Sequence, residues 1–178
     1  MRIIDTHCHL DDDKLYNISK DVVARAKKAG VIYLFNTADS LPSFERVLKL
    51  EESFKGTCYS VLGIHPEFAL ESDDYFFTAY KEREERKNQI KAIGEIGLDY
   101  YWRQNNKEFQ KEVFIKQIEI ANRLNLPISI HTREAIDDTI QILRKYKINK
   151  HGVLHCCPFN PELVKQGLQA GLYIAFGG

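Results

Sequence analysis

The strongest constraint on the fold of this chain is a regular alternation of two hydrophobic patterns. Short runs rich in apolar and β-branched residues recur along the sequence, at 2–5, 31–36, 58–63, 91–95, 127–131, 153–156 and 172–176. Each of the first six runs precedes a stretch in which apolar residues recur every three or four positions, as in a helix. Since strand, helix and strand form a right-handed parallel unit, the alternation predicts an α/β fold with one parallel sheet.

The predicted helices are bounded by residues that stop helical structure. Apolar faces predict helices at 22–29, 44–50, 109–124, 136–146 and 161–170. Gly30 and Gly171 stand where two of these helices would end, and Pro127 follows the longest. The mixed-charge run 81–87 predicts one more helix, with a solvated face. The pattern as a whole therefore predicts seven strands and six helices.

Two architectures accommodate these elements. A (β/α)8 barrel has eight strands and typically about 250 residues, whereas this chain has 178 residues. A doubly wound open sheet can also contain seven strands. Because a barrel carries its chemistry at the carboxyl ends of its strands, the placement of polar residues decides between the two. In either case residues 1–178 are expected to form a single domain.

Composition excludes some classes of protein and leaves others open. Apolar residues make up 44% and charged residues 28% of the chain, which is typical of a globular domain. The formal net charge is zero, so there is no global attraction to nucleic acid, although a local basic groove is compatible with it. No run is apolar enough to span a membrane, and the polar start is unlike a signal peptide. These features predict a cytoplasmic protein without a membrane partner.

The cysteines do not form a disulfide framework. The chain has four, Cys8, Cys58, Cys156 and Cys157, with no CxxC spacing. Reduced thiols are the default in a cytosolic protein. Cys8 and Cys156 are out of phase with the neighbouring histidines, whereas Cys157 could approach a metal as a thiolate, which would favour zinc. The alternative for all of them is a small buried side chain.

Histidines gather where the predicted strands end. Five of the six histidines follow or close a strand, namely His7, His9, His65, His131 and His155. His7 and His9 have period-two spacing, so their side chains share one face. Glu95 closes the fourth strand. A lone histidine at a strand end is more often a hydrogen-bonded loop residue, but this constellation on one rim favours a metal site.

Imidazole and carboxylate groups together define the chemistry expected at this rim. Such ligands suit Zn, Mn, Fe, Co or Ni, and a carboxylate can bridge two ions. Two ions roughly 3.5–4 Å apart can bind a phosphate, generate hydroxide at neutral pH and stabilise a leaving oxygen. The sequence contains no Gly-rich phosphate loop and no Ser-His-Asp order that would compete with this interpretation.

Taken in order, the motifs resemble those of the TatD family of metal-dependent deoxyribonucleases, within the amidohydrolase-like metal-dependent hydrolases. The matching stretches are IDTHCHL at 4–10, GIHP at 63–66, GEIGLDY at 94–100, IHTREA at 130–135 and HC at 155–156. A single HxH would be weak support, but this ordered set spans nearly the whole chain. The resemblance implies a TIM-type (β/α)8 barrel that holds one to three divalent ions.

The resemblance also implies roles for individual residues. His7 and His9 would hold a first ion, His131 and His155 a second, and Glu95 would bridge them and serve as the catalytic residue. The expected cofactors are two divalent ions, Mg, Mn or Zn. Family members resembling this chain hydrolyse DNA, often as 3′→5′ exonucleases that prefer single strands, and are linked to DNA repair.

Further residues on the same rim are candidates for substrate binding. His65 and Arg133 could contact phosphate oxygens, and an arginine can do so through two parallel hydrogen bonds. Asp99 and Tyr100 follow Glu95 on the rim and are also assigned to the substrate. The rings of the adjacent residues 101 and 102 could stack on unpaired bases, or they could pack within the loop.

One departure from the family pattern concerns the end of the chain. Family members place a metal-binding aspartate after an eighth strand, and this sequence ends after the seventh run. The expected fold is therefore a TIM-type barrel truncated to seven strands and six helices, incomplete at its C-terminus. It could be a fragment, a chain completed by a second chain, or an open-edged domain that forms a homodimer.

Two other functions compete with DNA hydrolysis. One is hydrolysis of a small amide or ester, since a barrel rim can host many chemistries. Against it, the bridging position is held by Glu95 and not by a lysine that could be carboxylated. The other is metal binding without catalysis, which the missing aspartate and the open sheet edge favour.

Overall fold

The computed structural model describes residues 2–71 and 90–177. Its seven strands are β1 (Ile3–Cys8), β2 (Val31–Thr37), β3 (Cys58–Leu62), β4 (Ile90–Asp99), β5 (Ile128–Arg133), β6 (Gly152–Leu154) and β7 (Leu172–Ile174). The α-helices are α1 (Asp13–Tyr16), α2 (Ser19–Lys28), α3 (Leu41–Ser53), α5 (Lys107–Leu124), α6 (Ile136–Lys145) and α7 (Pro161–Gln169). A 3₁₀ helix, η1 (Pro66–Glu71), follows β3.

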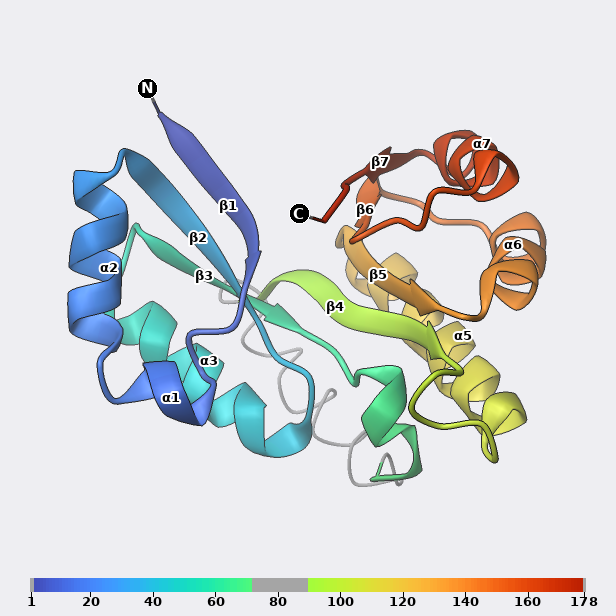
Figure 1. The fold of residues 1–178 in the computed structure, drawn as a ribbon, viewed down its shortest axis with the longest axis horizontal. Coiled ribbons are helices and arrows are strands. Elements are labelled where there is room, and N and C mark those ends of the chain that lie inside the picture. The colour runs from blue at the N-terminus through green and yellow to red at the C-terminus, as the bar shows by residue number, and fades with distance from the viewer. Residues whose placement is uncertain (1, 72–89, 178) are drawn as a thin grey trace.

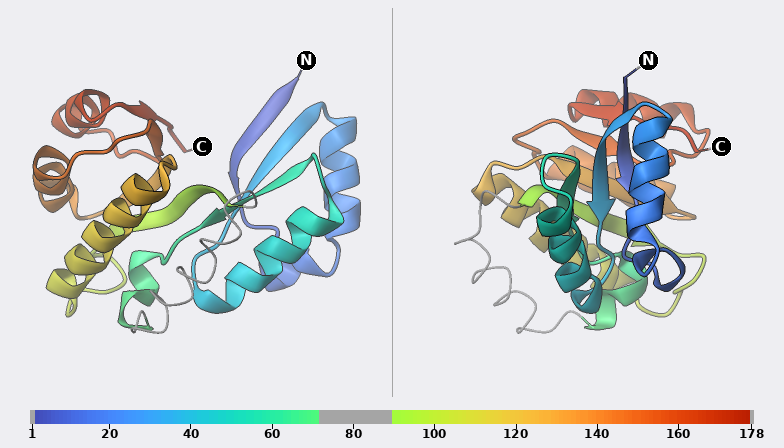
Figure 2. Two further views of the ribbon diagram at one scale, coloured as in Figure 1. Left: turned by 180° about the vertical axis from the view of Figure 1, so that it is seen from behind. Right: turned by 90° about the vertical axis from the view of Figure 1, so that its left-hand side faces the viewer.

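The strands form one parallel sheet in the order of the sequence, from β1 to β7. Figure 1 shows the sheet curving, with the helices on its outer side, and Figure 2 shows the same arrangement from two other directions. A doubly wound sheet reverses its strand order at a switch point, so the sequential order excludes that alternative. The fold is a seven-stranded arrangement of the TIM-barrel type, as the sequence predicted.

The inner side of the curved sheet forms a shared apolar pocket. Its volume is about 320 Å³, and residues from β1 through β7 line it, among them Thr6, Phe35, Val61 and Val153. Within the described residues, β1 pairs only with β2 and β7 only with β6, so the sheet has two edges. The described part of the chain contains no helix with the length and apolarity to span a membrane.

Two hydrophobic clusters attach the helices to the sheet. The larger cluster contains Phe44, Phe114 and Ile118 from the helices, packed against apolar residues of the middle and late strands. A smaller cluster packs the first helices against β1–β3 and includes Leu34 and Val23. Burial of these side chains stabilises each helix on its strand by about 25 cal/mol for each Å² of apolar surface removed from water.

Local sequence signals explain where several helices begin and end. The Asp12 side chain accepts a hydrogen bond from the Lys14 amide and begins α1. In the same way, the Asn160 side chain accepts from the Leu163 amide at the start of α7. Helix α5 ends at Leu124 and is capped by Asn125, which adopts a left-handed conformation that asparagine tolerates well.

Five of the helices expected from the sequence are present, and the one expected at 81–87 lies outside the described residues. The short helix α1 was not predicted, because four residues are too few to show a helical period. Strand β4 continues to Asp99, beyond the predicted end at Glu95. The added residues, Ile96 to Asp99, remain in the ladder with β5.

Gly152 offers a test of the close approach between β5 and β6. A Cβ atom at this position would overlap the backbone carbonyl oxygen of Ile128, which cannot rotate away. We expect Gly152→Ala to lower the free energy of unfolding by about 1–3 kcal/mol, measured by urea denaturation.

The matched control is Gly167→Ala on α7. There the new methyl would meet two flexible side-chain ends, Ile174 Cδ1 at 3.0 Å and Leu154 Cδ2 at 3.6 Å, and alanine favours a helix over glycine. We expect a smaller loss or a small gain in stability. An equal loss in both variants would contradict the close approach of the two strands.

Candidate metal centre

The predicted metal ligands converge from separate strands onto one end of the sheet. His7 lies in β1, Glu95 in β4 and His131 in β5. His65 lies between β3 and η1, and His155 follows β6. The carboxyl ends of parallel strands meet at the same rim, which explains why residues so far apart in sequence come together.

A glycine allows β4 and β5 to approach each other closely at this rim. Gly97 pairs in register with His131. Its φ angle of 141° favours glycine, and a Cβ atom would overlap the His131 carbonyl oxygen. The GEIGLDY stretch thus places glycine at the point where the β5 backbone at His131 lies close to β4.

Three residues form a first group of potential ligands, namely His7, His9 and Glu95. The Nε2 atoms of the two histidines are 3.1 Å apart. Glu95 Oε2 lies 3.3 Å from His7 Nε2 and 4.0 Å from His9 Nε2. These three atoms face one another closely enough to bind a single ion.

A second group shares the same carboxylate and consists of His65, Glu95 and His131. Glu95 Oε1 lies 3.1 Å from His131 Nδ1. The rings of His65 and His131 meet edge to face, with their centroids 4.5 Å apart. The two oxygens of Glu95 therefore point to different histidine groups, which is the geometry of a bridging carboxylate.

His155 and His65 differ in placement from what the sequence suggested. His155 stacks on the His7 ring, with the centroids 3.6 Å apart, and lies outside both ligand groups of the described residues. His65, which the sequence analysis assigned to phosphate, lies inside the second group. Sequence reasoning could place His65 at a strand end, but only the packing of His65 against His131 brings it within ligand distance.

The electrostatics of the site keep its carboxylate ionised. Burial opposes ionisation of Glu95, whose exposure is 5%, but hydrogen bonds from His131 and His7 hold its pKa well below the usual range. Burial likewise disfavours the charged form of His131, yet its contacts with Asp99 and Glu95 raise its pKa to about 9. A metal ion that binds this ring must therefore displace a proton.

Two other histidines are held in the neutral form. Burial, followed by the charge of the neighbouring His131, lowers the pKa of His65 to about 4. Burial, followed by the charge of His7, lowers the pKa of His155 to about 4. Neutral imidazole is the form that binds metal ions, so both rings are ready to act as ligands at neutral pH.

Asp99 links the centre to the loop that follows β4. Its Oδ2 atom lies 2.9 Å from His131 Nε2. Its Oδ1 atom accepts hydrogen bonds from the amides of Tyr101 and Trp102, at 2.9 and 3.0 Å. The carboxylate is 1% exposed, so it serves as an orienting partner for His131 behind the ligand groups.

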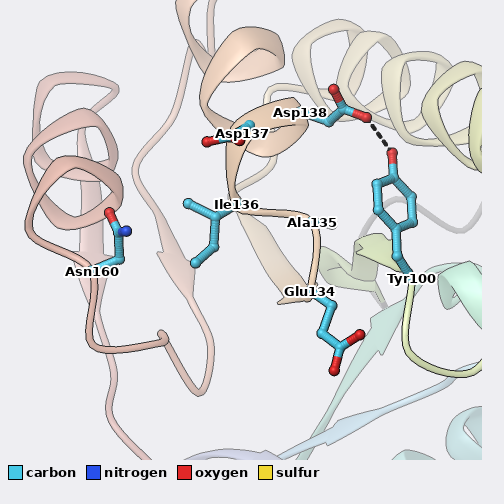
Figure 3. A pocket seen from close by; sticks show the side chains of 7 residues that line it. All are labelled: Tyr100, Glu134, Ala135, Ile136, Asp137, Asp138 and Asn160. Atoms are coloured by element: carbon cyan, nitrogen blue, oxygen red, sulfur yellow. Dashed lines mark hydrogen bonds between the residues drawn. The ribbon is translucent and has the colours of Figure 1, made fainter.

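The remaining predicted substrate residues differ in accessibility. Arg133 lies over the Tyr101 ring, with its guanidinium carbon 3.8 Å from the ring centroid. Tyr100 is buried, and its hydroxyl donates to Asp138 at 2.6 Å. Tyr100 lines a pocket with a volume of about 510 Å³. Figure 3 shows Tyr100 and Glu134 among the side chains that line it.

Neither ligand group contains a cysteine among the described residues. Cys8 packs in the smaller hydrophobic cluster and points away from His7, as its phase in the sequence indicated. The Cys157 thiol is buried and donates to the Pro158 carbonyl oxygen at 3.4 Å. The small buried side chain is thus the description that fits Cys157.

A parallel barrel-type sheet with histidines and a shared carboxylate at its carboxyl rim defines the class of metal-binding TIM-barrel proteins. Comparison with known proteins narrows this class. Residues 4–178 match the family described as TatD related DNase. The chain belongs to this family, as its motifs predicted.

Several relatives align over almost the whole chain. Human deoxyribonuclease TATDN3 is 34% identical over 97% of this chain and 67% of its own length. The uncharacterized metal-dependent hydrolase YcfH of Escherichia coli K12 is 35% identical over 100% of this chain and 67% of its own length. YabD of Bacillus subtilis, named in the same way, is 32% identical over 99% of this chain and 69% of its own length. The chain thus spans about two thirds of these relatives.

Solved structures agree with the fold. The TatD homologue YJJV from E. coli K12 superposes with a TM-score of 0.91 and 30% identity, covering 97% of this chain and 67% of that structure. A TatD family hydrolase from Entamoeba histolytica gives a TM-score of 0.86 at 25% identity, covering 99% of this chain and 65% of that structure.

Asp99→Asn tests the orienting role of this carboxylate. An amide NH2 group in place of Oδ2 cannot accept the hydrogen bond from His131 Nε2, so the ring loses its orienting partner. We expect affinity for Zn²⁺ and Mn²⁺ to fall by about 10- to 100-fold in isothermal titration calorimetry. Asp138→Asn, which alters contacts with Tyr100 and Lys111 outside the ligand groups, should leave metal affinity unchanged. Equal affinities in the two variants would refute the role.

Proposed function

We propose that this chain carries the centre of a metal-dependent hydrolase that cleaves phosphodiester bonds in DNA. The observation that carries the proposal is the shared carboxylate of Glu95, which faces two separate groups of imidazoles. Membership of the TatD related DNase family supports DNA as the substrate, as does the name of the human relative.

The donor set suits two divalent ions. His7 and His9 would hold the first ion, and His131 with His155 or His65 the second, with Glu95 between them. A site rich in imidazole favours zinc or manganese, whereas magnesium prefers oxygen ligands. The residues of the rim therefore fit the expected cofactor, with Mg the least favoured of Mg, Mn and Zn.

When bound, divalent ions supply Lewis acidity that activates water and offsets charge on the phosphate. The side chains at the rim keep the carboxylate charged and can orient the phosphate. Glu95 keeps its negative charge because His131 and His7 donate to it, so both of its oxygens remain available as acceptors. Arg133 and neutral His65 lie on the same rim, where they can orient phosphate oxygens by hydrogen bonds.

A second candidate function is metal binding without turnover. Strand β1 carries His7 and is an edge strand within the described residues. Among the residues that the structure describes, the first ligand group also contains a single carboxylate, Glu95. We propose that a further strand between β1 and β7 completes the single barrel domain, supplied by more of the same chain, a second chain or a homodimer. Hydrolysis of a small amide or ester has no comparable observation in its favour.

The finer features of the activity stay predictions. These are 3′→5′ exonuclease action, a preference for single strands, a role in DNA repair and a cytoplasmic location. For substrate binding, Asp99 would act indirectly, by orienting His131. Tyr100 would lie beside the bound DNA, as part of the wall of its pocket.

Glu95→Gln is the direct test of the shared carboxylate. The amide removes the negative charge and one acceptor oxygen, so we expect metal-dependent cleavage of DNA to fall by at least about 100-fold. Glu119→Gln, an exposed position on α5, makes the same chemical change away from the rim and should leave the rate unchanged. A folded, metal-loaded wild-type chain that cleaves no DNA would favour metal binding without turnover.

Strand polarity has its own experiment. Single-stranded oligomers labelled at the 3′ or the 5′ end are digested with Mg, Mn or Zn. A 3′→5′ exonuclease releases the 3′ label at once and shortens the 5′-labelled strand stepwise. Internal products from both substrates would contradict exonuclease action, and equal rates on duplex DNA would contradict the single-strand preference.

A further inference from the structure

Two large aromatic side chains are exposed directly beside the candidate metal centre. Tyr101 is 45% and Trp102 57% exposed, in the turn after β4. Their rings meet edge to face, with centroids 4.6 Å apart. The rings are thus held against each other while about half of each faces solvent, so packing within the loop does not account for them.

A cation from the neighbouring strand joins this pair. The guanidinium carbon of Arg133 lies 3.8 Å from the centroid of Tyr101 and 5.4 Å from that of Trp102. A planar guanidinium can stack on a ring and still donate hydrogen bonds outward from its edge. The three side chains therefore present flat π surfaces together with a positive charge.

Backbone register connects this group to the ligands. Asp99 pairs with Arg133, and Gly97 pairs with His131, two residues earlier on the same two strands. Two residues along a strand correspond to roughly 7 Å, and both side chains on β5 share one face. Asp99 also holds the amides of Tyr101 and Trp102 while it contacts His131. The position of the aromatic turn is therefore fixed relative to the centre.

We propose that Tyr101, Trp102 and Arg133 bind an unpaired nucleobase of the DNA strand whose phosphate lies at the candidate metal centre. This inference rests on the proposed function and specifies how the strand is held. The combination fits a nucleotide because its flat base stacks on rings while its phosphate requires a cation. In a duplex both faces of a base are covered by its neighbours, so the site selects unpaired strands.

The fluorescence of Trp102 can report binding at the proposed base site, because Trp102 is the only tryptophan in the chain. The metal-loaded protein is titrated with a single-stranded thymidine oligomer whose phosphorothioate linkages resist hydrolysis. A stacked base should quench the tryptophan fluorescence. An abasic oligomer with the same number of linkages carries the charge without the bases, and it should bind more weakly and leave the fluorescence nearly unchanged.

Variants separate stacking from charge. Tyr101→Ala should weaken binding of the thymidine oligomer by roughly tenfold, while Tyr101→Phe retains the ring and most of the affinity. Arg133→Lys keeps the charge but loses the planar stack, so it should reduce the preference for thymidine over abasic strands. Tyr173→Ala removes another exposed ring, on β7, and should leave binding unchanged.

The outcomes discriminate clearly. Equal affinity and equal quenching by the two oligomers would overturn the inference, as would equal losses in Tyr101→Ala and Tyr101→Phe. Base-dependent quenching by a protein that cleaves no DNA would uphold the nucleobase site and reject the proposed hydrolysis. Cleavage of unmodified DNA with no effect of Tyr101→Ala on binding would uphold the proposed hydrolysis and reject the nucleobase site.

Discussion

The structure depends on one buried carboxylate. Glu95 lies in the middle of the sheet, and its two oxygens face histidines from β1 on one side and β5 on the other. A lone charge at this depth would be costly, but the imidazoles that surround it make its ionised form the stable one. The same contacts supply the ligand set, so the arrangement that stabilises the charge is also the one that can bind metal ions.

Much of this arrangement could be read from the sequence. Short apolar, β-branched runs located the seven strands. Helical periods located the helices at 22–29, 44–50, 109–124, 136–146 and 161–170, because burial of one helix face leaves a periodic trace. Histidines at strand ends predicted the rim. The sequence could not supply the distances between the side chains on this rim. His65 and His155 carry the same signal, yet His65 packs beside His131 and His155 stacks on His7.

The misjudged strand end has a physical reason. The sequence analysis ended the fourth strand at Glu95, but Gly97 lets β5 come close, and the ladder continues to Asp99. That extension carries Asp99 to a buried position beside His131, and it sets the turn in which Tyr101 and Trp102 are exposed. A sequence pattern describes one segment at a time, whereas residues 96–99 are held as a strand by their pairing with β5.

The site also has a mechanical consequence for the fold. Strands β1 and β4 are not neighbours in the sheet, and in the described part of the chain β1 is an edge held by hydrogen bonds on one side only. The contact of His7 with Glu95 and its stacking on His155 cross the open interior and tie that edge to the far strands. The candidate metal centre therefore links the two halves of the sheet. Fraying of β1 and dismantling of the centre become a single local unfolding event.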